Sequence, residues 1–359
     1  MSTWMIYGAE GCMGRQVLEV ALEYRQSIVL AGRSGNLLQL AQEKGLPCRV
    51  FPVEAVPEIL PFLQKVDIFI DCAGPYTERT SAILRACSKR KIQYLDLSME
   101  YAWSQRVWEF APIFEKRGCW AVTGVSSYAL LSEYLAGYLK GQLPNITSLD
   151  LTYTGSQFPT TKGCLLSYLS ILACGQKARS QNRISTQWFS ASYKGEEWGA
   201  PSGASVNRVA RRVPLVDLVT VWIATRIPFI STFVAFSPNE IRMVRVGCTL
   251  ARFPFLHGIL LRFLRVYLQS RDAPITPAKI RVSGRAENAI GQHRSMQIEL
   301  EGPDTLTVKM ICDLALLADG TPSGYKGVFT AGQRLGTDYL FSSGDLETRM
   351  HHLSYGDES

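Results

Sequence analysis

Near its start the chain reads Thr3-Trp4-Met5-Ile6-Tyr7-Gly8-Ala9-Glu10-Gly11-Cys12-Met13-Gly14, a short apolar run followed at once by three glycines spaced three residues apart. Residues 15–24 continue with a helical pattern, so the sequence predicts a strand, a tight turn and a helix N-terminus in succession. Glycines let the backbone approach a ligand, and free N–H groups with the helix dipole attract an anion. Glycines also build ordinary turns, but directly after a strand this set predicts a pyrophosphate cradle made of Gly8, Ala9, Glu10, Gly11, Cys12, Met13 and Gly14.

The next apolar run, Ile28 to Ala31, ends in Gly32, Arg33 and Ser34. In a nucleotide-binding fold of alternating strands and helices, the end of the second strand meets the adenosine ribose. An acidic residue there suits the 2′-hydroxyl of NAD, whereas a guanidinium pairs with the 2′-phosphate of NADP. Arg33, with Ser34 beside it, therefore predicts NADP(H) as the cofactor. The alternative is an ordinary solvated arginine.

The first 125 residues alternate short apolar runs with helical patterns, which is typical of a parallel, doubly wound sheet. Later strands are expected at 48–51, 66–71, 92–96 and 119–122, with helices at 54–64, 80–89 and 103–116. After about residue 141 the alternation ends, and half-exposed strand patterns appear at 148–154, 185–193, 278–285 and 295–300, followed by a helix at 305–317. The predicted fold class is α/β, with an N-terminal Rossmann-type sheet and a second α+β domain that carries a mixed or antiparallel sheet.

These patterns predict two domains, 1–141 for the nucleotide and 142–324 for the substrate or a homodimer contact. The C-terminal segment 325–350 is expected to pack back on the first domain. Residues 354–359 are expected to form a loose tail. Nine scattered cysteines without a CxxC pair, and four histidines, indicate reduced thiols in a cytoplasmic protein and no metal site.

The formal net charge of +7 is unevenly placed. Residues 206–265 contain nine arginines against Asp217 and Glu240, in a very apolar context. That combination favours an acyl carrier or a peripheral membrane surface through 206–269, and no nucleic-acid motif accompanies it. Charges at this density exclude a membrane span over 214–236 or 246–269. Residues 255–268 are better explained as an amphipathic helix, with a buried or oligomer-forming helix as the alternative.

Several blocks together resemble the saccharopine dehydrogenase-like NADP-binding family. They are Tyr7 to Gly14, Leu30 to Ser34, Asp71 to Tyr76, Tyr94 to Glu100 and Gly327 to Gly336. The resemblance covers about the first 125 and the last 40 residues, and the length and ending are most similar to the trans-acting enoyl reductase branch. It implies reduction of an activated C=C bond in a polyketide or lipid acyl intermediate. The family's usual Asp after the sixth strand is absent from Gly124-Val125-Ser126-Ser127-Tyr128, which puts an inherited acid–base role there in doubt.

The loop Cys72-Ala73-Gly74-Pro75 follows the fourth strand, at the sheet edge where ligands bind, and is predicted to contact the cofactor. Asp96 follows the fifth strand at the same edge and is predicted to contact the cofactor; a helix-capping or loop-fixing role is as open for it as a role in catalysis. Hydride addition to an enoyl thioester makes an enolate that needs stabilisation and a proton. Tyr76, Glu100 and Tyr128 are the candidate catalytic residues, with Tyr101 a further tyrosine in reach. The sequence does not choose among them.

Three functions stay open at this stage. The first is the NADPH-dependent enoyl reductase. The second is an imine or carbonyl reductase, as the wider family implies. The third is a non-catalytic protein that binds NADP(H) as a scaffold or sensor, which the altered segment at Ser126 to Tyr128 keeps in view.

Overall fold

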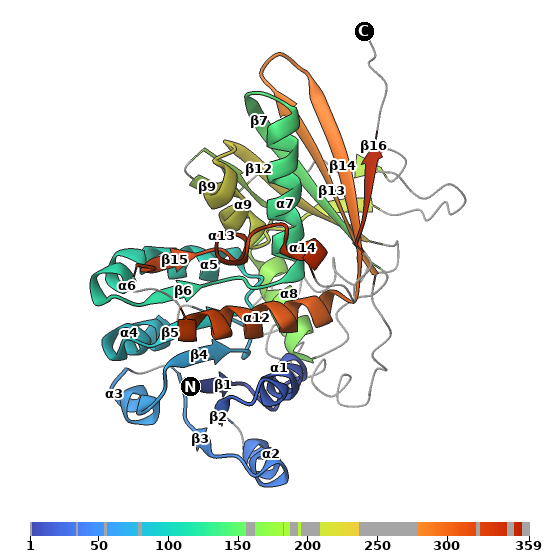
Figure 1. Cartoon of the computed structure of the whole chain (residues 1–359). Coiled ribbons are helices and arrows are strands. Elements are labelled where there is room, and N and C mark those ends of the chain that lie inside the picture. Colours follow the sequence, from blue (N-terminus) through green and yellow to red (C-terminus); the bar gives the residue numbers. More distant parts are fainter. Residues whose placement is uncertain are drawn as a thin grey trace. The chain divides into compact units, whose positions relative to one another are not determined.

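The computed structural model describes residues 2–33, 35–53, 56–77, 81–155, 162–181, 183–186, 193–194, 209–236, 279–320, 324–342 and 348–353. The chain divides into two compact units. The first contains residues 1–127 and 304–336, and the second contains residues 128–303 and 337–359. Each unit is built around its own sheet (Figure 1).

The first unit holds a seven-stranded parallel sheet in the order β15-β6-β5-β4-β1-β2-β3. Apart from the edge strand β3, its strands are mostly apolar and buried, as expected for a sheet covered on both faces. Strand order reverses between β1 and β4, which makes that point the topological switch. The strands are β1 Thr3–Tyr7, β2 Ser27–Gly32, β3 Cys48–Val50, β4 Ile68–Asp71, β5 Gln93–Asp96, β6 Trp120–Val122 and β15 Gly327–Phe329.

Helices connect these strands and cover the sheet (Figure 1). The helix α12 packs against α1, although the two are almost 300 residues apart in the sequence. The Cys312 thiol donates to the Val17 carbonyl at 3.8 Å, and the Tyr24 hydroxyl donates to Asp313 at 2.7 Å. The helices of this unit are α1 Cys12–Glu23, α2 Asn36–Lys44, α3 Val56–Ile59 with a 3-10 turn Leu60–Leu63, α4 Ser81–Arg90, α5 Tyr101–Glu109, α6 Ala111–Arg117, α12 Pro303–Gly320 and α13 Ala331–Leu335.

The predicted helix over 103–116 is two helices, α5 and α6. Phe110 ends α5, and Pro112 lies in the first turn of α6. Proline lacks the N–H that a continuous helix would use, and its ring crowds the carbonyl four residues earlier, so the helix breaks at this point.

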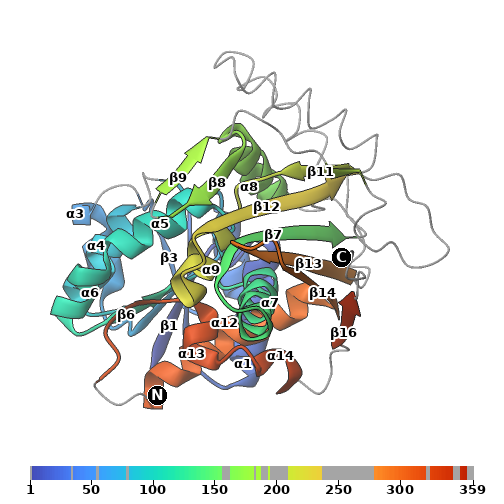
Figure 2. The same cartoon turned by 90° about the horizontal axis from the view of Figure 1, so that it is seen from above.

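The second unit holds a nine-stranded mixed sheet, as predicted for this part of the chain. Seven strands follow the order β10-β11-β12-β7-β13-β14-β16, and β8 pairs with both β12 and β9. Only β12 and β7 run parallel among these pairs. The strands are β7 Ile146–Gly155, β8 Lys177–Ser180, β9 Arg183–Thr186, β10 Tyr193–Lys194, β11 Val209–Arg212, β12 Phe229–Phe236, β13 Lys279–Asn288, β14 His293–Glu301 and β16 Thr348–Leu353. The helices are α7 Ser127–Gln142, α8 Lys162–Ala173, α9 Asp217–Thr225 and α14 Tyr339–Ser342; Figure 2 shows the sheet strands from above.

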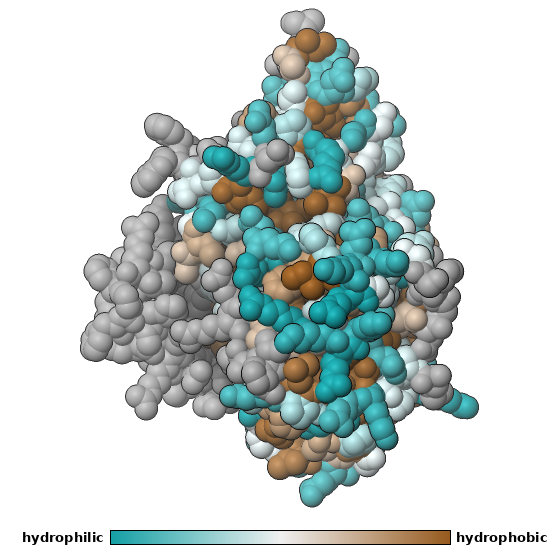
Figure 3. All heavy atoms as spheres, turned by 90° about the vertical axis from the view of Figure 1, so that its left-hand side faces the viewer, coloured by the Kyte–Doolittle hydropathy of each residue, from teal (hydrophilic) through white to brown (hydrophobic). Residues whose placement is uncertain are grey.

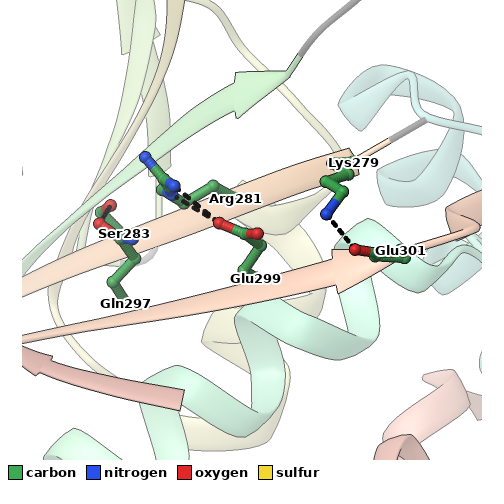
Figure 4. A network of polar contacts seen from close by, with 6 residues as sticks. All are labelled: Lys279, Arg281, Ser283, Gln297, Glu299 and Glu301. Carbon is green, nitrogen blue, oxygen red and sulfur yellow. Dashed lines mark hydrogen bonds and ion pairs between the residues drawn. The ribbon is translucent and has the colours of Figure 1, made fainter. Parts of the chain in front are cut away.

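The helix α7 packs directly on β13. A Cβ atom added to Gly284 would lie 2.0 Å from Leu135 Cδ2, so only a glycine leaves room for that leucine. Beyond this contact, β13 and β14 form a long hairpin whose paired side chains interact across the strands. Figure 4 shows three such pairs side by side, with Lys279 facing Glu301, Arg281 bonded to Glu299 at 2.6 Å and Ser283 donating to Gln297 at 3.3 Å.

The two units differ in their bounds from the predicted domains 1–141 and 142–324. The helix α12 belongs to the first unit because it packs on α1, and most of α7 belongs to the second. The segment 325–350 is divided: β15 and α13 extend the first unit, whereas α14 and β16 belong to the second, where β16 pairs with β14. The predicted strand 185–193 is also divided, between β9 and β10, with 187–192 outside the described residues.

The apolar, basic stretch is only partly described. Residues 214–236 form α9 and the strand β12, while 246–269, with the expected amphipathic helix at 255–268, lie outside the described residues. In the part of the chain that the structure describes, no helix has the length and hydropathy needed to cross a bilayer. On the face drawn in Figure 3, apolar side chains lie in separate patches between hydrophilic ones.

Candidate functional site

The predicted cofactor residues gather at the carboxyl edge of the parallel sheet. In the sheet register, Tyr7 at the end of β1 faces Ala31 of β2 on one side and Asp71 of β4 on the other, and Asp71 faces Asp96 of β5. The loops that follow these four strands therefore start at one level. They carry the glycine-rich turn, Arg33, residues 72–76 and residues 97–100.

The glycine-rich turn is closed by backbone contacts that side chains would block. Gly8 has φ +82°, and its N–H donates to the Ala31 carbonyl at 2.8 Å. A Cβ atom at Gly14 would lie 2.2 Å from the Gly8 carbonyl oxygen, and one at Gly8 would lie 2.9 Å from Ala73 Cβ. Gly8 and Gly14 are required by these approaches, which bring the turn, α1 and the loop after β4 together.

The first turn of α1 has the features of an anion site. The first N–H groups of a helix have no partner within it, and Gly11 at the N-cap supplies no side chain to cap them. The turn from Gly8 to Gly11 is fixed by a hydrogen bond of 2.9 Å from the Gly11 N–H to the Gly8 carbonyl. The N–H groups of Cys12, Met13 and Gly14 thus fit a pyrophosphate, which is the group predicted from the sequence.

Two charged side chains mark the end of β2. The Glu10 carboxylate lies against the Gly32 backbone, since a Cβ atom added there would be 2.7 Å from Glu10 Oε2. Arg33 is exposed at the same end, and its charge is one of the influences that lower the pKa of Asp71. Arg33 follows β2 directly, and its contact with a 2′-phosphate stays a prediction; Ser34 lies outside the described residues.

Asp96 is fully buried and serves as the centre of its loop. Its Oδ1 accepts hydrogen bonds from the Ser98 N–H at 3.0 Å, the Ser98 hydroxyl at 2.6 Å, the Thr123 hydroxyl at 3.1 Å and the Gly124 N–H at 2.9 Å. Its Oδ2 accepts from Trp103 Nε1 at 2.9 Å. A carboxylate has about four acceptor positions, so this one is saturated by the protein. Of the roles open for Asp96, the geometry favours loop fixing.

Tyr76 and Glu100 hold the loop after β4. The Tyr76 hydroxyl is buried, donates to the Asp71 carbonyl at 2.7 Å and accepts from the Leu97 N–H at 3.4 Å. Burial and the neighbouring carboxylates raise the pKa of Tyr76 well above its usual value. The Glu100 carboxylate accepts from the Tyr76 N–H at 3.3 Å and from the Met99 N–H at 3.0 Å. Both predicted catalytic residues therefore have structural bonds to maintain.

Tyr128, the third predicted catalytic residue, belongs to the second unit. It is half-buried at the start of α7, and its ring centroid lies 6.2 Å from that of Tyr153. The carbonyl of Tyr128 accepts the Ser132 hydroxyl at 3.1 Å. Tyr101, the further tyrosine, is buried at the start of α5 in the first unit.

The sequence did not predict a functional role for Asp71, although this residue begins one of the family-like blocks. It ends an apolar strand and is almost fully buried; burial raises its pKa to about 7, against hydrogen bonds from Ala73 N–H and Tyr94 that lower it. A second buried carboxyl group, Asp217, lies in the other unit, and burial raises its pKa to about 6. Hydrogen bonds with Tyr153 and Ser132 act against this rise, and the hydroxyls of these two residues are 2.5 Å apart. An acidic residue at the end or the start of an apolar run was the available signal.

Comparisons with known proteins agree with this geometry. Residues 4–122 match the model of the family described as saccharopine dehydrogenase NADP binding domain. No curated protein matches the chain. The fold is similar to that of apo saccharopine dehydrogenase (L-Glu forming) from Saccharomyces cerevisiae, with a TM-score of 0.60 and 13% identity over 98% of this chain and 100% of that chain.

A weaker likeness links the chain to a probable dehydrogenase from Thermotoga maritima, with a TM-score of 0.44 and 10% identity over 96% of each chain. The yeast structure confirms the predicted α/β fold, a Rossmann-type parallel sheet with a second mixed-sheet domain. The family match agrees with the prediction of NADP(H) as the cofactor. Residues 4–122 of this chain are thus similar to the saccharopine dehydrogenase NADP binding domain, and the whole chain shares the fold of the yeast enzyme.

Proposed function

We propose that this protein is an NADPH-dependent reductase that adds hydride to a polarised double bond. The observation that carries the proposal is the start of α1, where no side chain caps the free N–H groups. The turn before it contains glycines that leave no room for a side chain, and these residues lie in the segment that matches the NADP binding domain. When bound, NADPH supplies the hydride. The N–H groups of Cys12 to Gly14 would hold its pyrophosphate, and Arg33 would hold its 2′-phosphate.

The loops at the sheet edge would position the reacting groups. Asp96 fixes residues 98 and 123–124, while Tyr76 and Glu100 fix the loop after β4. Because the Tyr76 proton is already donated to the Asp71 carbonyl, releasing it would break a buried hydrogen bond. We therefore infer that Tyr76 and Glu100 are positioning residues, and Tyr128 stays the predicted proton donor that remains to be tested.

The first candidate substrate is the activated C=C bond of an acyl or polyketide intermediate, free or on a carrier protein. The resemblance to enoyl reductases and the apolar, arginine-rich stretch support it. The second candidate is a C=N or C=O bond, which the family match and the yeast-like fold support equally. The mass and bond position of the product distinguish the two.

The cofactor site is tested by fluorescence titration with NADPH and NADH. We expect Arg33→Ala to weaken NADPH binding about tenfold to hundredfold, as for the loss of a charge-assisted hydrogen-bond pair, and to leave NADH binding nearly unchanged. Arg117→Ala is the matched control, because Arg117 is exposed and precedes β6 at the opposite edge of the sheet. Equal affinity of the wild type for both nucleotides would refute the role of Arg33.

The catalytic proposal is tested by NADPH consumption with enoyl, imine and carbonyl substrates. Tyr128→Phe should lower turnover by about a hundredfold or more and leave NADPH affinity unchanged, as expected for a lost general acid. Full turnover in Tyr128→Phe would reject that assignment. NADPH binding without turnover on any substrate class would instead favour the scaffold or sensor.

A further inference from the structure

Two arginines of the second unit stack on one tryptophan. The guanidinium carbon of Arg179, on β8, lies 4.4 Å from the centre of the Trp222 ring, and that of Arg226 lies 4.2 Å from it. Trp222 is on α9, and Arg226 is the residue that ends this helix. The two guanidinium carbons therefore lie at most 8.6 Å apart, with the indole as their common neighbour.

Within the described part of the chain, acidic side chains do not balance the positive charge of this group. No carboxylate among the described residues forms an ion pair with either arginine. Arg179 is buried, and its pKa is lowered to about 10 by that burial and by the nearby charge of Arg226, with no carboxylate opposing the change. A buried cation normally has a compensating partner, so a cation like Arg179 favours the binding of an anion.

Backbone carbonyls of α9 and of the residue after β8 compensate only part of the positive charge of these side chains. Arg179 Nε donates to the Leu218 carbonyl, and Arg179 Nη1 donates to the Gln181 carbonyl at 3.4 Å. Lys140 Nζ donates to the Thr225 carbonyl at 2.6 Å, which adds a third cation at the end of the same helix. A helix C-terminus carries roughly half a negative charge, far less than the charge of three cations.

Arg226 also occupies an unfavourable backbone conformation. Its φ is +62°, in the left-handed region that glycine and asparagine adopt more readily. The side chain is exposed, and a guanidinium over an aromatic ring has N–H groups at its edge that can bind an anion. Arg179 has N–H groups beyond those used by the two carbonyls.

We propose that Arg179 and Arg226, stacked on Trp222, form a binding site for a phosphoryl group, distinct from the cofactor site of the first unit. A phosphate monoester carries close to two negative charges at neutral pH and several acceptor oxygens, which match two guanidinium groups. The phosphoryl group can belong to a soluble phosphate ester or to the headgroup of an anionic lipid. The inference does not depend on the reductase activity.

The indole N–H signal of Trp222 provides a local readout by nitrogen–proton NMR. Comparing wild type with Trp222→Phe identifies that signal among those of the seven tryptophans. Inorganic phosphate is then titrated at constant ionic strength, with chloride as the reference salt. We expect a saturable shift of the Trp222 signal with phosphate and none with chloride.

Arg226→Gln removes an exposed charge and should weaken phosphate binding on the order of tenfold, the loss of one charge-assisted contact. The matched control is Arg294→Gln. Arg294 is also exposed, and it lies four strands away from Arg179 across the same sheet. The pairings that connect the two residues run through Ile230, Leu149 and Ala286. With neighbouring strands about 4.8 Å apart, the two backbone positions are separated by about 19 Å. The control should bind phosphate like the wild type.

Sedimentation with vesicles separates the two sources of the phosphoryl group. Vesicles of phosphatidylcholine with phosphatidic acid should carry the wild type down, and Arg226→Gln should reduce this, if the ligand is a lipid headgroup. Phosphate binding without sedimentation assigns the site to a soluble phosphate ester. A Trp222 signal that does not move with phosphate, or moves equally in Arg226→Gln, overturns the proposal.

Discussion

Replacing Gly14 by alanine should damage the cofactor cradle at a point that the structure defines closely. The added Cβ atom would lie 2.2 Å from the Gly8 carbonyl oxygen and 2.8 Å from Ala9 Cα. Carbon and oxygen atoms that are not bonded to each other approach to about 3.3 Å at the closest. Both obstructing atoms are backbone, so no side-chain rotation relieves the contact, and α1 must move away from the turn by about 1 Å.

This displacement has a cost in stability and in binding. An overpacked contact of this kind costs about 1–3 kcal/mol, and the melting temperature falls about 2–4 °C per kcal/mol for a unit of this size. The helix N–H groups would also move from the position that the turn gives them. Losing one charge-assisted hydrogen bond to a phosphate costs about 1.5–3 kcal/mol, so NADPH affinity should fall at least about tenfold.

Fluorescence titration with NADPH and thermal unfolding measure the two effects. Gly137→Ala is the control: it lies on α7 in the second unit, and a Cβ atom there meets nothing within 4 Å. This change should leave NADPH affinity unaltered and stabilise the helix by about 0.5–1 kcal/mol. If Gly14→Ala melts and binds NADPH like the wild type, the close approach of α1 to the turn is refuted.

Three further predictions concern buried or half-buried ionisable side chains. Burial raises the pKa of Asp217 to about 6, so the folded chain holds this proton more tightly than the unfolded chain. The resulting contribution to the free energy of unfolding is present below about pH 4 and is lost as the pH rises through 6. The loss amounts to about 3 kcal/mol. Asp217→Asn should abolish this loss in urea unfolding at pH 4 and pH 8, and an unchanged difference between the two would contradict it. Asp96→Asn places an amide against donors such as Trp103 Nε1 and should lower the free energy of unfolding by about 3 kcal/mol or more, measured by the same method. A decrease of less than about 1 kcal/mol would refute the role of Asp96 in fixing its loop. Arg334→Met removes a guanidinium 4.0 Å from the Tyr325 ring centre and should cost about 1–2 kcal/mol in thermal unfolding; an unchanged melting temperature would show that the contact adds nothing.

The first sheet could be predicted from the sequence because its strands are short, mostly apolar and separated by helices. All six strands expected within the first 125 residues are present, and the glycine spacing located the turn. The break at Pro112 shows where the pattern misled, since the apolar period continues through two helices. The pairing of β15 with β6 could only be expected as a return of the chain, because nothing local encodes a contact between residues more than 200 positions apart.

The second sheet was harder to predict because its edges are short strands. β8 has four residues and β10 has two, and β8 is held by antiparallel pairing with both β12 and β9. Such strands carry little periodicity of their own and depend on long-range partners. Within the arginine-rich stretch the sequence showed the excess charge, but the stacking of Arg226 with Arg179 on Trp222 joins β8 to α9 and required the fold.

The carboxylates at the sheet edge show why residue type alone does not assign a role. Asp71 and Asp96 both end apolar strands, face each other in register and are buried. Asp96 is saturated by donors from Ser98, Trp103 and the segment at 123–124, whereas the Asp71 side chain accepts only from the Ala73 N–H and Tyr94 among the bonds described. Burial with few donors raises the pKa of Asp71 to about 7, so its charge changes near neutral pH directly beneath the loop of residues 72–76. The distinction between a fixed carboxylate and a titrating one depends on donors brought from other strands and helices, and the sequence at the two strand ends does not reveal it.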